Sequence, residues 1–327
     1  MTRPVIIDTD GGVDDAAALW WALLDPALDV LAVTVVWGNV PLDKAVLSVA
    51  RVLAAAGRPD IPIARGAAGP VGAAPELRPA TFIHGEDGLG NTTDGLPRPA
   101  MTSAQEAAPA LLRRLCAERP GEVSVLTIGP LSNLGLVLAD DPAFAATVRE
   151  LVVMGGSARA GGNALPNGEA NIAHDPVAAA LVATAAWTQP PLLVGLDVTR
   201  EATLTEAHFA LLAEHRSAAA AFLDAPLRFY RQFGAALTAP NCPIHDLVAT
   251  MALADPSLIP EAPVLPMAVD TAGGPSWGAT VVDFRAPAVA RLRGAEQDRP
   301  PGFGPWRIGL RADVARFRDQ AASLFGG

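Results

Sequence analysis

Short apolar runs and longer amphipathic stretches alternate along the first two thirds of the chain. The apolar runs are nearly continuous, as in strands buried on both faces, and each is followed by a stretch with helical spacing. The expected strands are Val5–Asp8, Val30–Val36, Val123–Ile128, Leu151–Met154 and Leu192–Leu196. The expected helices are Asp14–Leu24, Leu42–Ala56, Ser103–Glu118, Pro130–Leu138 and Pro176–Ala186. This alternation predicts an α/β fold with an open, mostly parallel, Rossmann-like sheet that helices cover on both faces.

The last third of the chain contains further strand-like runs and a final helix. The runs are Val264–Asp270, Ala279–Phe284 and Trp306–Leu310. They are either additional strands of the same sheet or a small subdomain. Because no linker separates this part from the rest, we expect a single domain over residues 1–327.

Two other segments are expected to form the walls of a pocket. Residues 65–100 are rich in Gly and Pro, which predicts a long loop, and loops of this length are usually functional or disordered. The segment 203–245 is expected to be helical over Thr203–Ala225 and again over Pro226–Gly234.

Composition narrows the function classes. The net charge is −10 and there is no basic block, which argues against binding to nucleic acids or to anionic membranes. Two cysteines are too few for a disulfide framework or a zinc cluster. The N-terminus enters a predicted strand almost at once, unlike a signal peptide, and no apolar run is long enough to span a bilayer. We therefore expect a soluble, cytoplasmic protein.

The most informative chemistry lies where the first predicted strand passes into the first predicted helix. Asp8, Asp10, Asp14 and Asp15 fall within eight positions, around a glycine pair that permits a tight turn. Crowded carboxylates repel one another, and burying them unpaired costs several kcal/mol. A hard cation that takes oxygen ligands resolves this conflict. The alternative is that these acids only favour a turn and a helix N-terminus.

A second acid stands far away in the sequence but in a similar setting. Asp246 begins an apolar helical stretch, so Asp10, Asp15 and Asp246 are natural ligands for one cation. Its alternative role is helix capping. His245, directly before it, is a candidate general acid, since a histidine pKa lies near neutrality. His84, on the expected long loop, is a weaker candidate.

Polar residues also follow the other predicted strands, at the edge where a parallel sheet binds its ligands. Asn39 follows the second strand and Thr127 ends the third. Further along, Asn163, Glu169 and Asn171 alternate on a Gly-rich loop, and such amides and carboxylates suit the recognition of hydroxyl groups. Turn chemistry is the competing explanation.

These motifs, taken together, resemble the inosine–uridine-preferring nucleoside hydrolase family. The opening segment resembles that family's Asp-x-Asp-Pro-Gly-x-Asp-Asp pattern, here Asp8-Thr9-Asp10-Gly11-Gly12-Val13-Asp14-Asp15. Further matches follow in the same order along nearly the whole chain: Gly38-Asn39, His84-Gly85, Thr127-x-Gly129-Pro130-Leu131-Ser132-Asn133, Met154-Gly155-Gly156, Glu169-x-Asn171, Asp175-Pro176, His245-Asp246 and Thr280-Val281-x-Asp283.

The resemblance implies a Ca²⁺-dependent enzyme that hydrolyses ribonucleosides to ribose and a free base, and that forms a homodimer or homotetramer. It implies that Asp10, Asp15, Asp246 and the carbonyl of Thr127 hold the Ca²⁺ ion. Asp10 would also take a proton from a water held by the ion, and His245 would protonate the departing base.

The resemblance also implies how the sugar is bound. Asp14 and Asn171 would bind the ribose hydroxyls, while Asn163, Glu169 and the Met154 region would surround the 5′-hydroxyl. Asn39 would place the water or the ribose. His84 would lie near the sugar or base.

The residues suit this chemistry. Cleavage of an N-glycosidic bond develops positive charge on the sugar, which nearby carboxylates stabilise. A vicinal diol is a good ligand for Ca²⁺. Gly11 departs from the family pattern, because it stands where the family usually has proline. Tyr230 is the only tyrosine in the chain, so the segment before His245 lacks the tyrosines often found there, which leaves the preferred base open.

Two other functions fit part of the sequence. A haloacid-dehalogenase-type phosphatase would use Asp8 as nucleophile, Asp10 as acid and base, and Mg²⁺. It would also need a well-placed lysine, and Lys44 is the only lysine in the chain. A non-catalytic protein that binds nucleosides or ribose is the other alternative.

Overall fold

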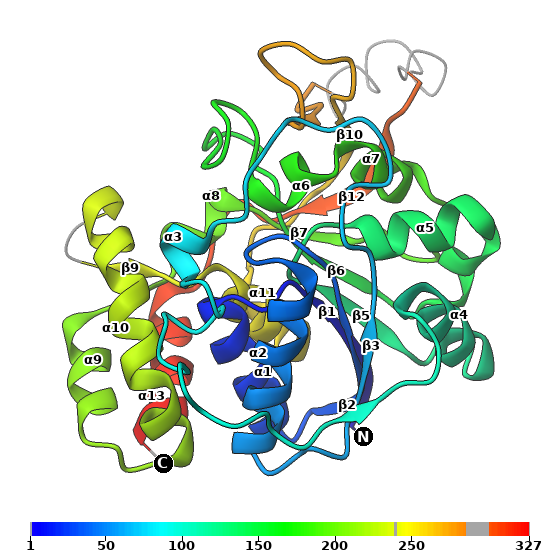
Figure 1. Ribbon diagram of the computed structural model, residues 1–327. Helices are drawn as coiled ribbons and strands as arrows, with labels where there is room; N and C mark the ends of the chain where they lie inside the picture. The colour runs from blue at the N-terminus through cyan, green and yellow to red at the C-terminus, as the bar shows by residue number, and fades with distance from the viewer. Residues whose placement is uncertain (1, 239–240, 286–300, 327) are drawn as a thin grey trace.

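The computed structural model describes residues 2–238, 241–285 and 301–326. The strands are β1 (Arg3–Thr9), β2 (Leu28–Val35), β3 (Pro62–Arg65), β4 (Thr102–Ser103), β5 (Ser124–Thr127), β6 (Leu151–Met154), β7 (Leu192–Val194), β8 (Thr203–Leu204), β9 (Cys242–Pro243), β10 (Val264–Val269), β11 (Thr280–Val282) and β12 (Gly304–Ile308). In the described ranges, ten of them form one sheet in the order β11-β10-β12-β7-β6-β5-β1-β2-β3-β4 (Figure 1). From β7 to β4 every pairing is parallel, and β12 adds a further parallel pair with β7.

The helices are α1 (Val13–Leu24), α2 (Leu42–Ala55), α3 (Thr81–His84), α4 (Ala108–Glu118), α5 (Ser132–Asp140), α6 (Ala170–His174), α7 (Pro176–Thr184), α8 (Leu196–Thr199), α9 (Glu206–Ala213), α10 (Ala218–Thr238), α11 (His245–Ala254) and α13 (Val314–Gly326). Two short 3₁₀ helices are η1 (Pro142–Thr147) and η2 (Pro256–Leu258). Both faces of the sheet are covered (Figure 1).

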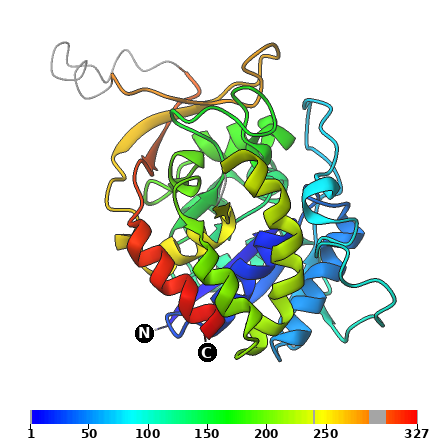
Figure 2. The same cartoon turned by 90° about the vertical axis from the view of Figure 1, so that its left-hand side faces the viewer.

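The period-two alternation of a strand explains the two cores. Val5 and Ile7 of β1 pack into the core that contains α1, α2 and α11, while Ile6 points into the core that contains α5 and α7. On the first of these faces α13 lies beside α9, which in turn packs on α10 (Figure 2). The predicted α/β fold with a mostly parallel sheet is therefore confirmed.

The order of the strands reverses at β1. The chain moves outward on one side from β1 to β2, β3 and β4, and then returns to place β5 on the other side of β1. Open α/β sheets bind ligands at such a switch point, outside the carboxyl ends of the strands. The ends of β1 and β5 are therefore the expected position of the site.

The C-terminal strands belong to the same sheet rather than to a subdomain. Both pairings of β10, with β11 and with β12, are antiparallel, so the sheet is mixed at this end. Antiparallel pairing could not be inferred from apolar runs alone, because the same runs suit either direction.

Three expectations about the pocket walls need correction. The segment 65–100 is not only a loop, because it contains α3. The helix expected over Thr203–Ala225 is interrupted after α9, where His215 adopts a positive φ of 48°. The expected break at Pro226 is absent, since α10 continues through this residue.

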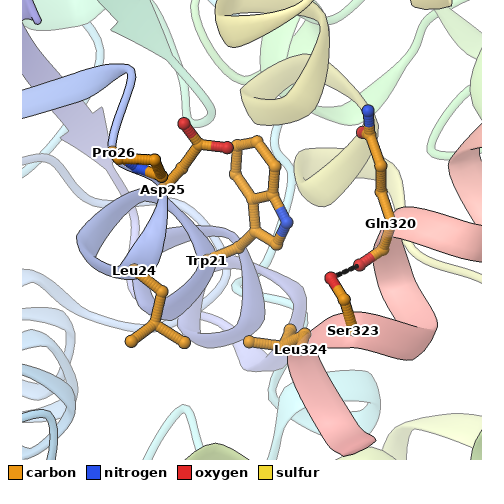
Figure 3. A pocket seen from close by; sticks show the side chains of 7 residues that line it. All are labelled: Trp21, Leu24, Asp25, Pro26, Gln320, Ser323 and Leu324. Atoms are coloured by element: carbon orange, nitrogen blue, oxygen red, sulfur yellow. Dashed lines mark hydrogen bonds between the residues drawn. The ribbon is translucent and has the colours of Figure 1, made fainter. Parts of the chain in front are cut away.

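In the residues that the structure describes, no helix combines the length and the hydropathy needed to cross a membrane. A small cavity of about 230 Å³ lies between the C-terminal end of α1 and α13, lined in part by Trp21 and Leu324 (Figure 3). An α-helix rises about 1.5 Å per residue, so the length of α1 separates this cavity by roughly 15 Å from the acids at the other end of the helix.

Candidate active site

The turn between β1 and α1 places the first acids at the switch point. Gly11 has a φ of +73°, and a Cβ there would lie 2.7 Å from the Cα of Ala45. Glycine is therefore required in this conformation for both backbone and packing reasons. The backbone N–H of Gly12 donates to Asp15 Oδ2 at 2.8 Å, which fixes the Asp15 side chain at the start of α1.

The side chain of Asp10 is held by the loop that follows β2. Asn39 donates its backbone N–H to Asp10 Oδ2 at 2.7 Å and its side-chain amide to Asp10 Oδ1 at 2.9 Å. The same amide nitrogen lies 3.1 Å from Asp15 Oδ2, so Asn39 bridges the two acids. Gly38 allows this approach, because a Cβ there would lie only 2.0 Å from Asp10 Oδ2.

The fourth acid comes from α11, which packs directly on α1. One carboxylate oxygen from each of Asp14, Asp15 and Asp246 lies within 4.8 Å of the others, and all three residues are buried. Asp10 lies outside this closest set. The carboxylate of Asp15 is nevertheless near enough to those of Asp10 and Asp246 to raise the pKa of each.

Burial and mutual repulsion act together on these acids. Burial is the larger cause, and the charge of Asp15 is the next, in raising the pKa of Asp10 and in raising that of Asp14 to about 7. For Asp246 burial again comes first, followed by the charge of Asp14. Such a group of buried carboxylates binds protons readily unless a cation replaces them.

The residues present fit a hard divalent cation. The donors are carboxylate oxygens, which Ca²⁺ and Mg²⁺ prefer, and Asp14 Oδ1 is buried without a hydrogen-bond partner. Thr127 ends β5 beside Asp8 of β1 and is fully buried. The acidic cluster is thus a candidate metal centre.

A cavity of about 700 Å³ opens onto this cluster, a volume typical of small-molecule sites. All seven residues expected to bind substrate line it, together with the expected acid His245 and the expected metal ligand Asp246. They are Asp14, Asn39, His84, Met154, Asn163, Glu169, Asn171, His245 and Asp246. Asp10, Asp15 and Thr127 are almost fully buried and do not form its surface.

The polar loop that carries Asn163 and Glu169 is held in place by the start of α6. Glu169 caps this helix, accepting the N–H groups of Asn171 at 3.0 Å and Ile172 at 3.2 Å, and also the N–H of Gly156 at 2.8 Å. The side-chain oxygen of Asn163 accepts the N–H of Ala170 at 2.9 Å. Turn and capping chemistry is therefore present at these residues, in addition to their position in the pocket wall.

Asn171 reaches the ends of two strands. Its amide nitrogen lies 3.2 Å from the carbonyl oxygen of Met154 and 3.3 Å from that of Ile128. The end of β6 and the residue after β5 are thus joined through one side chain. This places Met154 and Asn171 in the same part of the pocket.

His84 lies at the end of α3 rather than on an open loop. Its Nδ1 accepts the backbone N–H of Val13 at 3.1 Å and lies 3.7 Å from Asp14 Oδ1. Burial lowers the pKa of His84 to about 3, with a smaller contribution from His245. The ring is therefore neutral, and Nδ1 is the acceptor nitrogen.

His245 is the first residue of α11, and its Nδ1 lies 2.7 Å from Thr199 Oγ1. Burial lowers its pKa to about 4, and the positive charge of Arg200 acts in the same direction. The sequence suggested a pKa near neutrality, and burial, which the sequence does not reveal at this position, is the reason for the difference.

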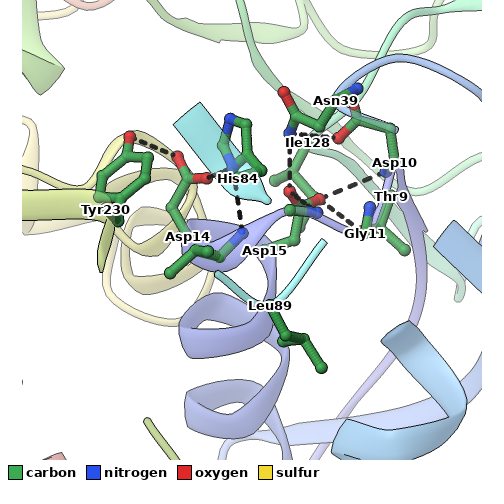
Figure 4. Close-up of polar contacts among 12 residues, drawn as sticks. Thr9, Asp10, Gly11, Asp14, Asp15, Asn39, His84, Leu89, Ile128 and Tyr230 are labelled. Carbon is green, nitrogen blue, oxygen red and sulfur yellow. Dashed lines mark hydrogen bonds and ion pairs between the residues drawn. The ribbon is translucent and has the colours of Figure 1, made fainter. Parts of the chain in front are cut away.

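The sequence also failed to place three further residues at the site. Tyr230 lines the pocket from α10 and donates its hydroxyl to Asp14 Oδ2 at 3.3 Å (Figure 4). Phe233, one turn further, packs against Phe82 with ring centroids 5.8 Å apart. Arg200 enters from the end of α8. Position on an amphipathic helix before His245 was the only available signal for the two aromatic residues.

The geometry does not support the phosphatase alternative. Asp8 is fully buried beneath the turn, and its Oδ1 accepts hydrogen bonds from Thr34 at 2.5 Å and Asn133 at 2.7 Å. Lys44 is exposed on α2. A nucleophile would need to face the cavity, and Asp8 does not line it.

A buried acidic cluster at the floor of a small-molecule pocket, on an α/β sheet, is typical of a metal-dependent hydrolase. Comparison with known families makes this specific. The family described as inosine-uridine preferring nucleoside hydrolase matches residues 5–319, and the chain belongs to that family. It is a nucleoside hydrolase, an enzyme that cleaves the N-glycosidic bond of ribonucleosides.

Individual relatives agree with this assignment. The chain is 39% identical over 231 residues to a probable uridine nucleosidase 2 of Oryza sativa subsp. japonica, covering 70% of this chain and 67% of the relative. It is 37% identical over 290 residues to the non-specific ribonucleoside hydrolase RihC of Escherichia coli, covering 87% and 89%. A solved structure of a plant nucleoside hydrolase, the PpNRh1 enzyme, is 31% identical and superposes over 100% of both chains with a TM-score of 0.89.

Proposed function

We propose that this protein is a Ca²⁺-dependent hydrolase that converts purine or pyrimidine ribonucleosides to ribose and the free base. The observation that carries the proposal is the approach of Asp14, Asp15 and Asp246 within 4.8 Å at the floor of the pocket. Relatives named uridine nucleosidase and non-specific ribonucleoside hydrolase support a broad choice of base.

In this proposal Asp10, Asp15, Asp246 and the carbonyl of Thr127 hold the Ca²⁺ ion. The ion would orient the sugar diol and make water more acidic. Flexible coordination by several oxygen atoms favours Ca²⁺ over the smaller Mg²⁺ in a site built mainly of protein carboxylates.

Asp10 is the proposed general base. Its two oxygens are fixed by Asn39, so the lone pair that accepts the proton has a set direction. Asn39 would thereby help to place the attacking water, because it fixes the Asp10 carboxylate that accepts the proton.

The sugar is proposed to bind with its diol toward Asp14 and Asn171. Asn163, Glu169 and the Met154 carbonyl region would surround the 5′-hydroxyl, since all three line the pocket. The carboxylates under the ring would stabilise the positive charge that develops as the glycosidic bond breaks. His84 would lie near the sugar, as a neutral ring.

His245 is the proposed acid for the leaving base. It lines the pocket beside Asp246, and its Nδ1 is already engaged with Thr199, which leaves Nε2 for the substrate. A departing nucleobase is a poor anion, so a proton or a hydrogen bond at this point lowers the barrier.

A ribose-release assay tests the proposal. Inosine, adenosine, guanosine, uridine and cytidine are incubated with the protein in Ca²⁺ and after removal of the ion with EDTA, and free ribose is measured. We expect release from purine and pyrimidine nucleosides with Ca²⁺ and a loss of at least roughly a hundredfold without it. Tight nucleoside binding without ribose release would instead favour the non-catalytic alternative.

Three expectations about the whole protein belong to the same proposal: one domain over residues 1–327, a homodimer or homotetramer, and a cytoplasmic location. Light scattering of the purified protein measures the oligomeric state, and cell fractionation measures the location. A single cooperative unfolding transition by several probes would support the single domain.

A further inference from the structure

The short helix α8 connects two parts of the pocket that are distant in sequence. It follows β7 and ends at Thr199, whose hydroxyl is fully buried and lies 2.7 Å from His245 Nδ1. The next residue, Arg200, lines the cavity. The histidine at the leaving-group end of the pocket therefore depends on α8 for its orientation.

Both ends of α8 are fixed to the loop that follows β6. At the first end, Leu196 donates its N–H to the Gly156 carbonyl at 2.9 Å. Asp197 accepts the N–H groups of Ala158 at 2.6 Å and Arg159 at 2.8 Å.

At the other end, the Arg200 guanidinium donates to the carbonyls of Ala160 at 2.6 Å and Gly162 at 2.7 Å. Its hydrogen bonds are thus directed at the loop and away from the imidazole. A side chain carried on an element fixed at both ends loses little freedom when it binds its partner.

We propose that Thr199 is a positioning residue, which holds the imidazole of His245 so that Nε2 is directed at the departing base. The inference rests on the proposed role of His245 as the acid. It follows from the buried 2.7 Å contact and from the position of His245 on the cavity wall.

A hydroxyl group suits this task. It can accept a hydrogen bond from Nδ1–H and can equally donate to a bare Nδ1. The contact can therefore form with either tautomer of the neutral ring, and when the hydroxyl donates to a bare Nδ1 it leaves Nε2–H free to donate a hydrogen bond to the departing base. A carboxylate partner could only accept, and it would hold the proton on the ring.

The test compares Thr199→Val and Thr199→Ser on inosine and uridine and on 4-nitrophenyl riboside, whose leaving group needs no proton. Loss of this buried hydrogen bond should lower kcat on the natural nucleosides roughly tenfold. KM should stay within about twofold, and activity on 4-nitrophenyl riboside should stay within about twofold, because the sugar contacts are unchanged. Thr199→Ser should recover activity to within about threefold, since it restores the hydroxyl.

Thr203→Val is the matched control. Its hydroxyl is also buried, four residues further along, but it has no hydrogen-bond partner in the described residues. This variant should leave the ratio of activities on inosine and 4-nitrophenyl riboside unchanged. Thr199→Ala serves as the second variant if Thr199→Val does not fold.

A double variant separates the two proposals. In a His245→Ala background, Thr199→Val should cause no further loss on inosine, because the ring that it positions is gone. Equal losses by Thr199→Val on both kinds of substrate, or a full loss in that background, would overturn the inference on Thr199. Failure of the wild type to release ribose from any nucleoside would overturn the proposed function as well.

Discussion

The hydroxyl of Tyr230 donates a hydrogen bond to Asp14 Oδ2 at 3.3 Å, across 216 positions of the chain. Both residues are buried, and the tyrosine ring also lies 5.4 Å from that of His84, centroid to centroid. Asp14 is therefore held on one side by α10, while its other oxygen has no hydrogen-bond partner in the described residues. That oxygen, Oδ1, lies 3.7 Å from Nδ1 of His84.

Replacing Tyr230 with phenylalanine should weaken sugar binding. The variant keeps the ring but removes the hydroxyl, so Asp14 loses one fixed direction. We expect KM for inosine and uridine to rise about threefold to tenfold, the usual range for one hydrogen bond, with a smaller change in kcat. Steady-state kinetics measure this. An unchanged KM would show that the hydroxyl does not orient Asp14.

Replacing Asp10 with alanine should remove the general base. We expect kcat to fall by at least roughly a hundredfold, the lower end of general-base contributions. Asp29→Ala is the control, because Asp29 is exposed on β2, far from any role in the pocket. Near-normal turnover by the Asp10 variant in the ribose-release assay would exclude the assigned base.

Replacing His245 with alanine should affect substrates according to their leaving groups. Natural nucleosides need a proton on the base and should lose roughly a hundredfold or more, while 4-nitrophenyl riboside should lose little. The ratio of the two losses is the measurement. Equal losses on both substrates would contradict the role of His245 as acid and would indicate a structural role for its ring.

Metal binding should release protons. Burial raises the pKa of Asp10 and Asp246, and it raises that of Asp14 to about 7, so the ion-free cluster holds protons at and below neutral pH. A divalent ion must displace them, and its affinity should therefore fall as the pH decreases from 8 to 6. Calorimetric titrations with Ca²⁺ in buffers of different ionisation enthalpy measure the protons released. Affinity independent of pH would contradict the raised pKa values.

Asp8 should reduce stability at high pH. Burial raises its pKa to about 7, so between about pH 4 and pH 7 the folded protein keeps a proton that the unfolded chain has released. The stability that the folded protein gains by holding this proton is fully present at low pH and is lost as the pH rises through 7.

Asp8→Asn tests this, because asparagine retains an acceptor for Thr34 and Asn133 but cannot ionise. Denaturant unfolding of both EDTA-treated proteins at pH 5 and pH 8 is the experiment. The stability of the wild type relative to the variant should fall by a few kcal/mol over this range, at about 1.4 kcal/mol per pKa unit. Parallel pH profiles would contradict it.

Local sequence was sufficient for the central part of the fold. The strands β1, β2, β5, β6 and β7 lie within a few residues of their expected positions, because each is a short run of apolar residues buried on both faces. The helices α1, α2, α5 and α7 were likewise expected. These elements also carry the acids of the opening motif, so the sequence placed Asp10 just after a strand and Asp15 at the start of the next helix.

The parts that sequence did not predict depend on contacts between distant segments. The left-handed conformation of His215 and the continuation of α10 through Pro226 are set by packing, which overrides the usual preferences of these residues. The contacts of Tyr230 with Asp14 and of Thr199 with His245 join elements far apart in the chain. No spacing of residue types in the sequence predicts these contacts.

The packing of α11 on α1 gives the enzyme a built-in order of assembly. The acids of the opening motif emerge first during synthesis, and their last partner, Asp246, is made more than two hundred residues later. Long-range contacts of this kind close late in folding, since the loop entropy must be overcome first. The appearance of ribose-releasing activity during refolding would therefore report when α11 docks on α1, and not when the sheet forms.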